Sequence, residues 1–193
     1  MNQDPNNNQQ ASPAMRIAMA AVLTAVTAVF TLAVRVPVAP TRGYINLGDV
    51  AIYFTAFTFG PITAFIAGGL GTAIADLLAG YAQWAPISFF NHGVQGLAAG
   101  YIIRMAAKAK RVSIETGHPY APLTVVGVVL AGIAGTVLMV GLYYLAGGFM
   151  VGFAAAAVEI PGNLIQNAAG IGLGTVLSIS VYRAYPPVRR LFW

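Results

Sequence analysis

Residues 47–105, LGDVAIYFTAFTFGPITAFIAGGLGTAIADLLAGYAQWAPISFFNHGVQGLAAGYIIRM, decide the fold of the chain. They contain two uncharged runs, residues 50–75 and 77–103, and each run exceeds the roughly 17 to 25 residues of one membrane-spanning helix. Gly60-Pro61 divides the first run, because proline is tolerated in the first turn of a helix but not in its interior. The pattern therefore predicts three helices, over residues 47–59, 61–79 and 85–105.

Three further apolar segments flank this region and predict helices over residues 14–34, 123–146 and 153–183. Of the 193 residues, 58% are hydrophobic and only 8% are charged, whereas a soluble domain carries about 25% charged residues. The sequence therefore predicts an all-α membrane protein, a compact bundle of six transmembrane helices over residues 14–183. We expect a disordered N-terminal tail (residues 1–13) and a basic cytoplasmic C-terminal tail (residues 184–193).

The basic residues indicate how the bundle is oriented. Eight of the ten lie before the first span, in the loop around residues 104–111, or after the last span, and cytoplasmic segments are enriched in Lys and Arg. Because an even number of spans must then separate Arg16 from that loop, both termini are expected in the cytoplasm, with Arg35 and Arg42 outside. The helix over residues 47–59 would cover only about 20 Å of a hydrocarbon core of about 30 Å. We therefore expect it to tilt little or to lie beside a polar cavity.

Polar side chains gather in the outer half of this predicted bundle. Glu159, Asn163 and Gln166 follow a helical i, i+4, i+7 stripe, and ionisable residues within spans usually face a cavity or a partner. A channel needs polar lining from face to face, so the one-sided distribution predicts a binding pocket that is open to the outside and closed below. The candidate binding residues are Asn46, Asp49, Asp76, Tyr81, Trp84, Asn91, His92, Gln95, Tyr143, Glu159, Asn163 and Gln166.

Structural explanations stay open beside these binding roles. The aromatic candidates have the position of a belt at the membrane interface. Asp49 could cap a helix or pair with Arg35 or Arg42, and Asp76 could bond to neighbouring backbone. His92 could be a buried histidine of the core, and the polar stripe could bond helices to one another.

The sequence also excludes several kinds of chemistry. It has no cysteine and no GxxxxGK[ST] phosphate-binding loop, so the chain does not hydrolyse ATP through such a loop. We expect no cofactor, no metal site and no catalytic residues. The net charge of +5 could suggest nucleic acid, but the charges lie at the ends of apolar runs. Membrane lipid, and not nucleic acid, is therefore the expected surrounding partner.

Several short segments resemble the substrate-binding S components of energy-coupling factor (ECF) vitamin transporters. They are YINLGD (44–49), FGP (59–61), ADLLAGY (75–81), AP (85–86) and PGNLIQ (161–166), together with the small-residue stripe of the first helix. The order and spacing of these segments agree with that family over roughly residues 14–183.

The resemblance implies a substrate-binding subunit of the prokaryotic cytoplasmic membrane, not an enzyme, that captures a water-soluble vitamin or precursor from outside. It implies docking through Ala14, Ala18, Ala21 and Ala25 onto a coupling membrane subunit that carries two ATPase subunits. ATP hydrolysis in those partners would topple the S component so that its pocket faces inward. Residues 36–46 resemble the lid of the family's pocket.

The candidate side chains bound the class of ligand. Carboxylates, amides and aromatic rings suit a flat, nitrogen-rich heterocycle that is neutral or cationic, such as a thiamine-like pyrimidine or a pyridoxine-like vitamer. Many relatives of this type carry a lysine near the position of His92, so the histidine leaves the choice of ligand open. Three other classes stay as alternatives: a self-contained small-solute permease or channel, an intramembrane enzyme, and an assembly protein.

Overall fold

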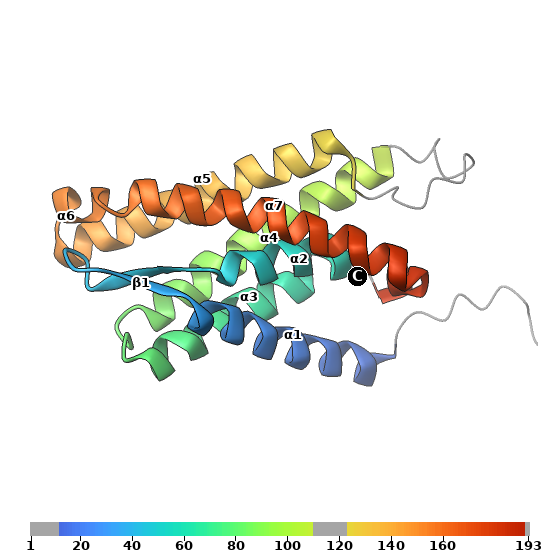
Figure 1. Cartoon of the computed structure of the whole chain (residues 1–193), viewed down its shortest axis with the longest axis horizontal. Coiled ribbons are helices and arrows are strands. Elements are labelled where there is room, and N and C mark those ends of the chain that lie inside the picture. Colours follow the sequence, from blue (N-terminus) through green and yellow to red (C-terminus); the bar gives the residue numbers. More distant parts are fainter. Residues whose placement is uncertain (1–11, 110–122, 192–193) are drawn as a thin grey trace, which may run out of the picture.

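Six α-helices of 12 to 27 residues, one short α-helix of five residues, a β-hairpin and a 3-10 helix make up the residues that the computed structural model describes, 12–109 and 123–191. The hairpin separates the first two helices, and the short helix precedes the last long one (Figure 1). The elements are α1 (Pro13–Ala33), β1 (Arg35–Val38), β2 (Gly43–Asn46), α2 (Gly48–Phe59), α3 (Pro61–Ala79), α4 (Ala85–Ala109), α5 (Val125–Val151), α6 (Phe153–Ala157), α7 (Ile160–Ala184) and the 3-10 helix η2 (Pro186–Leu191). Most of the predicted N-terminal tail, the basic residues Lys110 and Arg111, and the last two residues lie outside the described ranges.

Glycine and proline set the helix boundaries that the sequence predicted between residues 47 and 80. Gly60 has φ 94°, and Pro61 occupies the first turn of α3, so α2 ends at Phe59 as expected. Gly80 ends α3 in the left-handed conformation with φ 84°, and its N–H bonds to carbonyl oxygens of the preceding turn. Glycine adopts these conformations without strain because it has no Cβ.

The prediction of one continuous helix over residues 153–183 is wrong. The segment divides into α6 and α7, and Val158 and Glu159 form a turn between them. Pro161 lies in the first turn of α7, and a helix does not run through it because proline lacks an N–H and its ring crowds the preceding turn. The break places Glu159 at the N-terminus of α7, where it meets the hairpin.

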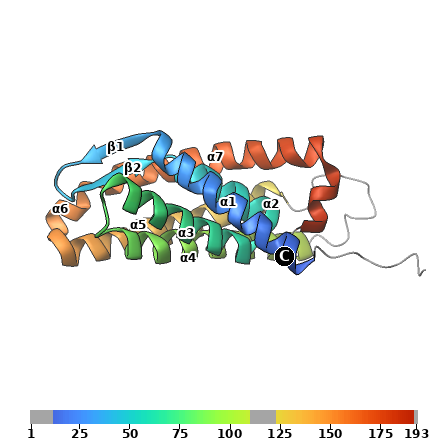
Figure 2. The ribbon, with the colours of Figure 1, turned by 90° about the horizontal axis from the view of Figure 1, so that it is seen from below.

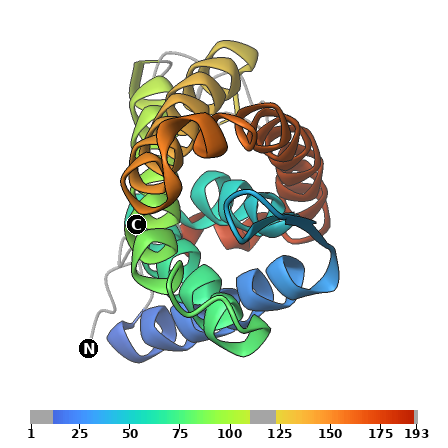
Figure 3. The same ribbon diagram turned by 90° about the vertical axis from the view of Figure 1, so that its left-hand side faces the viewer.

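α2 is the central helix of the bundle. It packs against α1, α3, α4 and α7, and Figure 3 shows it enclosed by the other helices. All of its residues except Phe54 are buried. Its twelve residues cover about 18 Å, less than the hydrocarbon thickness of about 30 Å. Neighbouring helices therefore cover this short helix in place of lipid.

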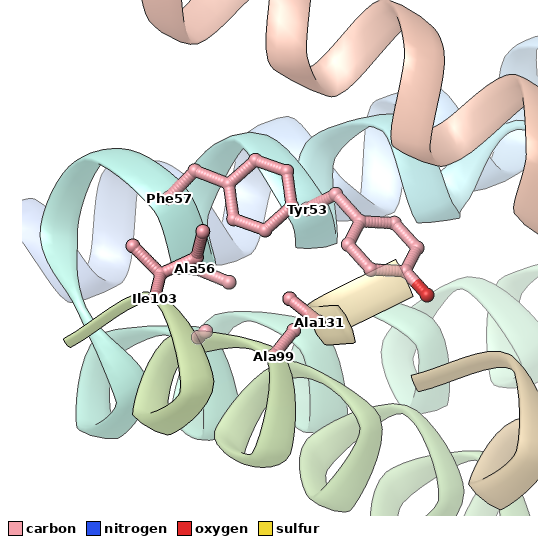
Figure 4. Packing of buried hydrophobic residues seen from close by; sticks show 7 residues of the cluster. Tyr53, Ala56, Phe57, Ala99, Ile103 and Ala131 are labelled. Carbon is pink, nitrogen blue, oxygen red and sulfur yellow. The ribbon is translucent and has the colours of Figure 1, made fainter. Parts of the chain in front are cut away.

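The contacts of α2 combine an apolar core with a close helix crossing. The core cluster contains Tyr53, Ala56 and Phe57 of α2, Ala64 of α3, Ala99 and Ile103 of α4, and Ala131 of α5 (Figure 4). At the crossing with α7, a Cβ added to Gly170 would lie 2.5 Å from the Cβ of Asp49 and 3.1 Å from its backbone oxygen. Small residues at such crossings let membrane helices approach closely.

Four helical segments in the described ranges are long and apolar enough to cross a membrane: α1, α3, α5, and the α6–α7 segment Phe153–Ala184. Large apolar side chains such as Val125, Phe149 and Ile165 are exposed on α5 and α7, as contact with lipid requires. α2 is too short to count among the spans, and α4 carries Asn, His and Gln in its first half in place of a continuous apolar run. This measure does not confirm the predicted number of six spans.

The two ends of the bundle differ. The hairpin, α6 and the connection between α3 and α4 lie at one end, whereas α1 begins and α7 ends at the other (Figures 1 and 2). The strands pair in antiparallel fashion, with Arg35 opposite Asn46 and Val38 opposite Gly43. The sequence predicted this segment as a loop over a pocket and not as two strands, because four-residue strands are too short for a local pattern to show.

Candidate functional site

A polar cavity lies under the hairpin, at the end of the bundle that holds α6. Its lining residues come from the hairpin, the last turn of α3, the start of α4 and the residue before it, α5, and the start of α7 with the residue before it. They are Gly43, Tyr44, Asn46, Asp76, Trp84, Ser88, Tyr143, Glu159, Asn163 and Gln166. The empty space between these residues measures about 350 Å³ including its opening, but the centre of a water molecule fits within only about 20 Å³ of it. In this conformation the cavity has room for about one water molecule.

Two buried carboxylates hold the hairpin over the cavity. Thr41 Oγ1 donates to Glu159 Oε1, and the Tyr44 hydroxyl donates to Asp76 Oδ1 at 2.6 Å. Burial and the hydrogen bond to Asp76 hold the pKa of the Tyr44 phenol well above its usual value, so this hydroxyl stays protonated and is the donor. The Tyr44 ring also packs on the ring of Tyr81, with 4.6 Å between their centroids.

Hydrogen bonds also fix the turn and the last residue of the hairpin. Trp84 Nε1 donates to the backbone oxygen of Arg42 at 3.1 Å. The backbone N–H of Asn46 donates to Gln166 Oε1 at 2.7 Å, and Asn46 Oδ1 accepts from the N–H of Gly48 at 2.7 Å. Asn46 therefore satisfies an N–H at the start of α2 and joins the hairpin to α7.

The cavity offers hydrogen-bond acceptors in excess. Asp76 is 3% exposed, and its Oδ2 has no hydrogen-bond partner among the described residues. Glu159 adds a second carboxylate to the lining, and none of the lining residues is Lys, Arg or His. A buried acceptor without a donor is unfavourable. The site is therefore suited to a ligand with N–H or O–H donors, or with a positive charge.

A second polar cluster lies behind Gln166 and does not line the cavity. Asp49 Oδ2 accepts from Gln166 Nε2 at 3.1 Å, and Asp49 Oδ1 lies 3.3 Å from His92 Nδ1. His92 Nδ1 in turn lies 2.8 Å from Gln95 Oε1, and Gln95 Nε2 donates to Asn167 Oδ1 at 3.0 Å. Asp49, His92, Gln95 and Asn167 are each at most 1% exposed. Asp49 thus has His92 as its ionisable neighbour, and not the arginines of the hairpin segment.

Tyr143 connects the cavity with this cluster. Its hydroxyl lies 2.7 Å from Ser88 Oγ, and its ring meets Trp84 and His92 at centroid distances of 5.9 and 5.5 Å. Within residues 12–109 and 123–191, no group of three or more His, Asp or Glu side chains is placed to hold a metal ion. The polar groups and rings of this end offer hydrogen bonds, charge and aromatic contacts.

Comparison with known protein families shows which family the chain belongs to. The model of a family described as the S component of ECF-type riboflavin transporters matches residues 13–183. The chain belongs to this family of ECF S components. S components are substrate-binding subunits of transporters and not enzymes, so the chain is a multi-pass membrane protein of vitamin transport. The alternative of an intramembrane enzyme is wrong.

Two relatives are similar to the chain in sequence, and one solved structure is similar to it in fold. A Pyrococcus woesei protein described as an uncharacterized protein in a gap 3′ region is 30% identical over 160 residues, 83% of this chain and 97% of its own. The thiamine precursor transporter HmpT of Lactococcus lactis subsp. cremoris (strain MG1363) is 30% identical over 169 residues, 87% of this chain and 88% of its own. A solved structure of the S component of a bacterial ECF transporter shares the fold, with a TM-score of 0.59 at 21% identity over 91% of this chain and 97% of that chain.

Most of the predicted binding residues of this S component lie at the cavity. Those that line it are Asn46, Asp76, Trp84, Tyr143, Glu159, Asn163 and Gln166. Tyr81 reaches it only through its contact with Tyr44. The others lie behind the cavity wall, where Asp49, His92 and Gln95 belong to the second cluster and Asn91 donates to the backbone oxygen of Met139 at 3.0 Å.

The predicted binding residues did not include Tyr44, Ser88 or Asn167, although Asn167 lies on the same helix as Asn163 and Gln166 and is polar like them. Tyr44 lies two residues before Asn46 in β2, and this spacing places both side chains on one face of a strand. Ser88 lies four residues before His92 on α4, a helical spacing that could have found it. Asn167 Oδ1 accepts from Gln95, Tyr53 and Thr136, and only its polarity within an apolar helix signals this position.

The predicted docking residues lie away from this cavity. Ala14, Ala18, Ala21 and Ala25 are all exposed on α1. Ala21 and Ala25 also line an apolar groove between α1 and α3. These four alanines of the small-residue stripe therefore face outward, whereas Ala28, further along the same stripe, is buried in the bundle.

Proposed function

We propose that this S component binds a small heterocycle with N–H donors, of the thiamine-precursor type, and is the high-affinity binding subunit for its ATP-driven uptake. The observation that carries the proposal is the buried, unpartnered Oδ2 of Asp76 in the cavity wall. A ligand N–H that bonds to this oxygen would satisfy it with a charge-assisted hydrogen bond. The name of HmpT, a thiamine precursor transporter, supports the same class of ligand.

The rest of the lining supports a flat ring with polar substituents. Trp84 and Tyr143 supply aromatic surface at the cavity, and aromatic rings pack on heterocycles. Asn163 and Gln166 supply amides, and Glu159 supplies a second acceptor group. An aminopyrimidine matches this set through its amino group, and a pyridoxine-like vitamer would match it through hydroxyl donors. Riboflavin, which the family description names, is the competing ligand.

The hairpin is proposed to act as the lid of this site. Its contacts with Asp76, Glu159, Trp84 and Gln166 close the cavity. A ligand would enter when these contacts open. After the hairpin closes again, each carboxylate could accept hydrogen bonds from both the ligand and a hairpin hydroxyl, since it has two oxygens.

The hairpin end is proposed to face the outside of the cell, in a bundle of six spans with cytoplasmic termini. α1 begins, and α4 and α7 end, at the opposite end of the bundle (Figure 1). Arg16, Arg104 and Arg183 therefore lie toward that end. Basic residues favour the cytoplasmic side, which supports this orientation.

The exposed face of α1 is proposed to dock on the coupling membrane subunit of an ECF complex, which carries two ATPase subunits. Ala14, Ala18, Ala21 and Ala25 would let a partner helix approach closely. Energy from ATP hydrolysis in the partner subunits would then turn the cavity toward the cytoplasm. The S component itself would supply only capture and docking.

Equilibrium binding to the purified full-length chain tests the ligand. Isothermal titration with a thiamine-precursor aminopyrimidine should give a Kd below about 1 µM, with pyridoxine and riboflavin as parallel ligands. Tighter binding of riboflavin, or of an anion, would contradict the proposed substrate class and leave the family membership intact.

Reconstitution separates the transporter subunit from a self-contained permease or channel. Liposomes that contain the chain alone should retain bound ligand without net uptake. Liposomes that also contain the coupling and ATPase subunits should accumulate it when ATP is supplied. Uptake by the chain alone, without ATP, would favour the permease.

A further inference from the structure

Asp49 contacts a cavity residue without lining the cavity itself. Its Oδ2 accepts from Gln166 Nε2 at 3.1 Å, and Gln166 is the residue that bonds the backbone N–H of Asn46 at the end of the hairpin. We propose that Asp49 is a positioning residue that fixes the amide of Gln166 and, through it, holds the hairpin closed. This inference rests on the proposed function of the hairpin as a lid.

The neighbours of Gln166 allow only one orientation of its amide. On one side it meets a carboxylate, which accepts hydrogen bonds when ionised and does not donate them; on the other it meets a backbone N–H, which only donates. If the amide turned over, its oxygen would face Asp49 and its NH₂ group would face the N–H of Asn46. Both hydrogen bonds would be lost together, and with them the hydrogen bond that joins Asn46 of the hairpin to α7.

The cluster behind Asp49 places the His92 ring beside its carboxylate. His92 Nδ1 lies 2.8 Å from Gln95 Oε1, an acceptor, so this nitrogen carries the hydrogen and donates it to Gln95. Asp49 Oδ1 lies 3.3 Å from the same nitrogen and has no hydrogen-bond partner among the described residues. Gln95 Nε2 then points to Asn167 Oδ1. These hydrogen bonds fix the His92 ring next to Asp49, while the hydrogen bond to the carboxylate itself comes from Gln166.

The backbone crossing gives Asp49 a rigid base. α7 passes so close that a Cβ at Gly170 would lie 2.5 Å from the Cβ of Asp49. Gln166 lies one turn earlier on α7, so the carboxylate and the amide stay in register as long as α2 and α7 remain packed. The support therefore connects the core of the bundle with the last residue of the hairpin.

Trp84 provides a readout that needs no ligand. The chain has two tryptophans, Trp84 and Trp193, so Trp193→Phe leaves Trp84 as the only indole. Trp84 is 4% exposed and donates to the backbone oxygen of Arg42 in the hairpin turn. Opening of the hairpin exposes this ring, and the collisional quenching of its fluorescence by acrylamide measures the opening.

The decisive variants exchange the donor and the acceptor in the W193F background. Q166E places two carboxylates against each other, and we expect the ratio of open to closed hairpin to rise about tenfold, with a matching rise in quenching. D49N/Q166E keeps the net charge and restores a donor opposite an acceptor, while the glutamate still accepts from the N–H of Asn46. We expect this pair to return quenching to the value of the W193F parent.

Two further variants separate positioning from a general loss of packing. D49L removes the acceptor and should also raise quenching of Trp84. T55V is the matched control, since Thr55 is buried on the same helix and its hydroxyl has no hydrogen-bond partner in the described part of the chain; it should leave quenching unchanged. Circular dichroism of each variant in the same detergent establishes that the helices are retained.

The outcomes distinguish this inference from the proposed substrate. Rescue by D49N/Q166E supports the positioning role even if no heterocycle binds. Quenching that stays low in Q166E, that stays high in D49N/Q166E, or that rises equally in T55V overturns it, whatever the ligand proves to be. If D49L does not fold, the comparison of Q166E with D49N/Q166E decides alone.

Discussion

Tyr44 of β2 donates a 2.6 Å hydrogen bond to Asp76 of α3, although 32 residues separate them in the sequence. The bond uses Asp76 Oδ1, while Oδ2 of the same carboxylate is buried without a partner in the cavity wall. One carboxylate therefore faces both the hairpin and the space where we propose the ligand binds. Closure of the hairpin and recognition of the ligand become coupled through this side chain.

Tyr44→Phe should weaken ligand retention more than ligand association. The variant keeps the ring that packs on Tyr81 but loses a hydrogen bond of the closed hairpin, worth about 1 kcal/mol. We expect the dissociation rate to rise about fivefold, measured by stopped-flow displacement of a bound aminopyrimidine. Tyr81→Phe, which keeps the ring contact and the bond between Tyr44 and Asp76, should leave the rate near that of the parent. Equal rates in both variants would contradict the role of the hydroxyl.

Asp76→Asn should discriminate between ligands that do and do not carry an amino group. The substitution removes the charge of the acceptor, and hydrogen bonds to charged groups contribute about 1.5 to 3 kcal/mol, so affinity for the aminopyrimidine should fall roughly 10- to 100-fold. A ring of the same size without the amino group should bind parent and variant with similar, weak affinity. Isothermal titration of both ligands against both proteins gives the four affinities of a double-mutant-type cycle, from which the energy of the amino group's bond to Asp76 follows. A parallel loss for both ligands would instead indicate that the variant disturbs the cavity.

Gly170→Ala should destabilise the bundle, and Gly172→Ala should not. A Cβ at Gly170 would meet the Cβ and backbone of Asp49, whereas a Cβ at Gly172 meets nothing within 4 Å. We expect the first change to lower the free energy of unfolding by about 1 to 3 kcal/mol. The second should raise it by about 0.5 to 1 kcal/mol, because alanine favours a helix over glycine. Denaturation in mixed micelles compares the two, and equal stabilities would mean that α2 and α7 do not cross closely at this point.

Helix positions and the polar stripe of α7 could be predicted because local physics sets them. Gly60-Pro61 divides α2 from α3 however the two helices pack, because proline interrupts a helix that would otherwise run through it. Glu159, Asn163 and Gln166 share a face by helical spacing alone, and all three line the cavity. Pro161 carried a signal of the same kind for the break before α7, because it lies in the first turn of that helix.

The depth of each polar residue could not be predicted in this way. His92 and Gln95 were expected in the pocket, but Tyr143 from α5 and Gln166 from α7 lie on the cavity side of them. Which side chain stands in front depends on how three helices pack, and no local pattern contains that information. The role of Tyr44 likewise depends on the pairing of β1 with β2 and on the position of α3.

Ala18→Trp should abolish transport and leave ligand binding unchanged. Ala18 is exposed on α1, and α1 contributes no residue to the cavity lining, so an indole there would not reach the ligand. It would hold a partner helix away from the close approach that small residues permit. Uptake into liposomes that contain the coupling and ATPase subunits measures the first effect, and titration of the purified variant measures the second.

Val137→Trp provides the matched control for this prediction. Val137 is 66% exposed on α5, so the same large side chain would be placed on a different outward face of the bundle. We expect this variant to transport normally, because lipid can adapt to an indole whereas a packed helix crossing cannot. If Ala18→Trp supports normal uptake, or if both variants fail alike, the α1 stripe is not the docking face.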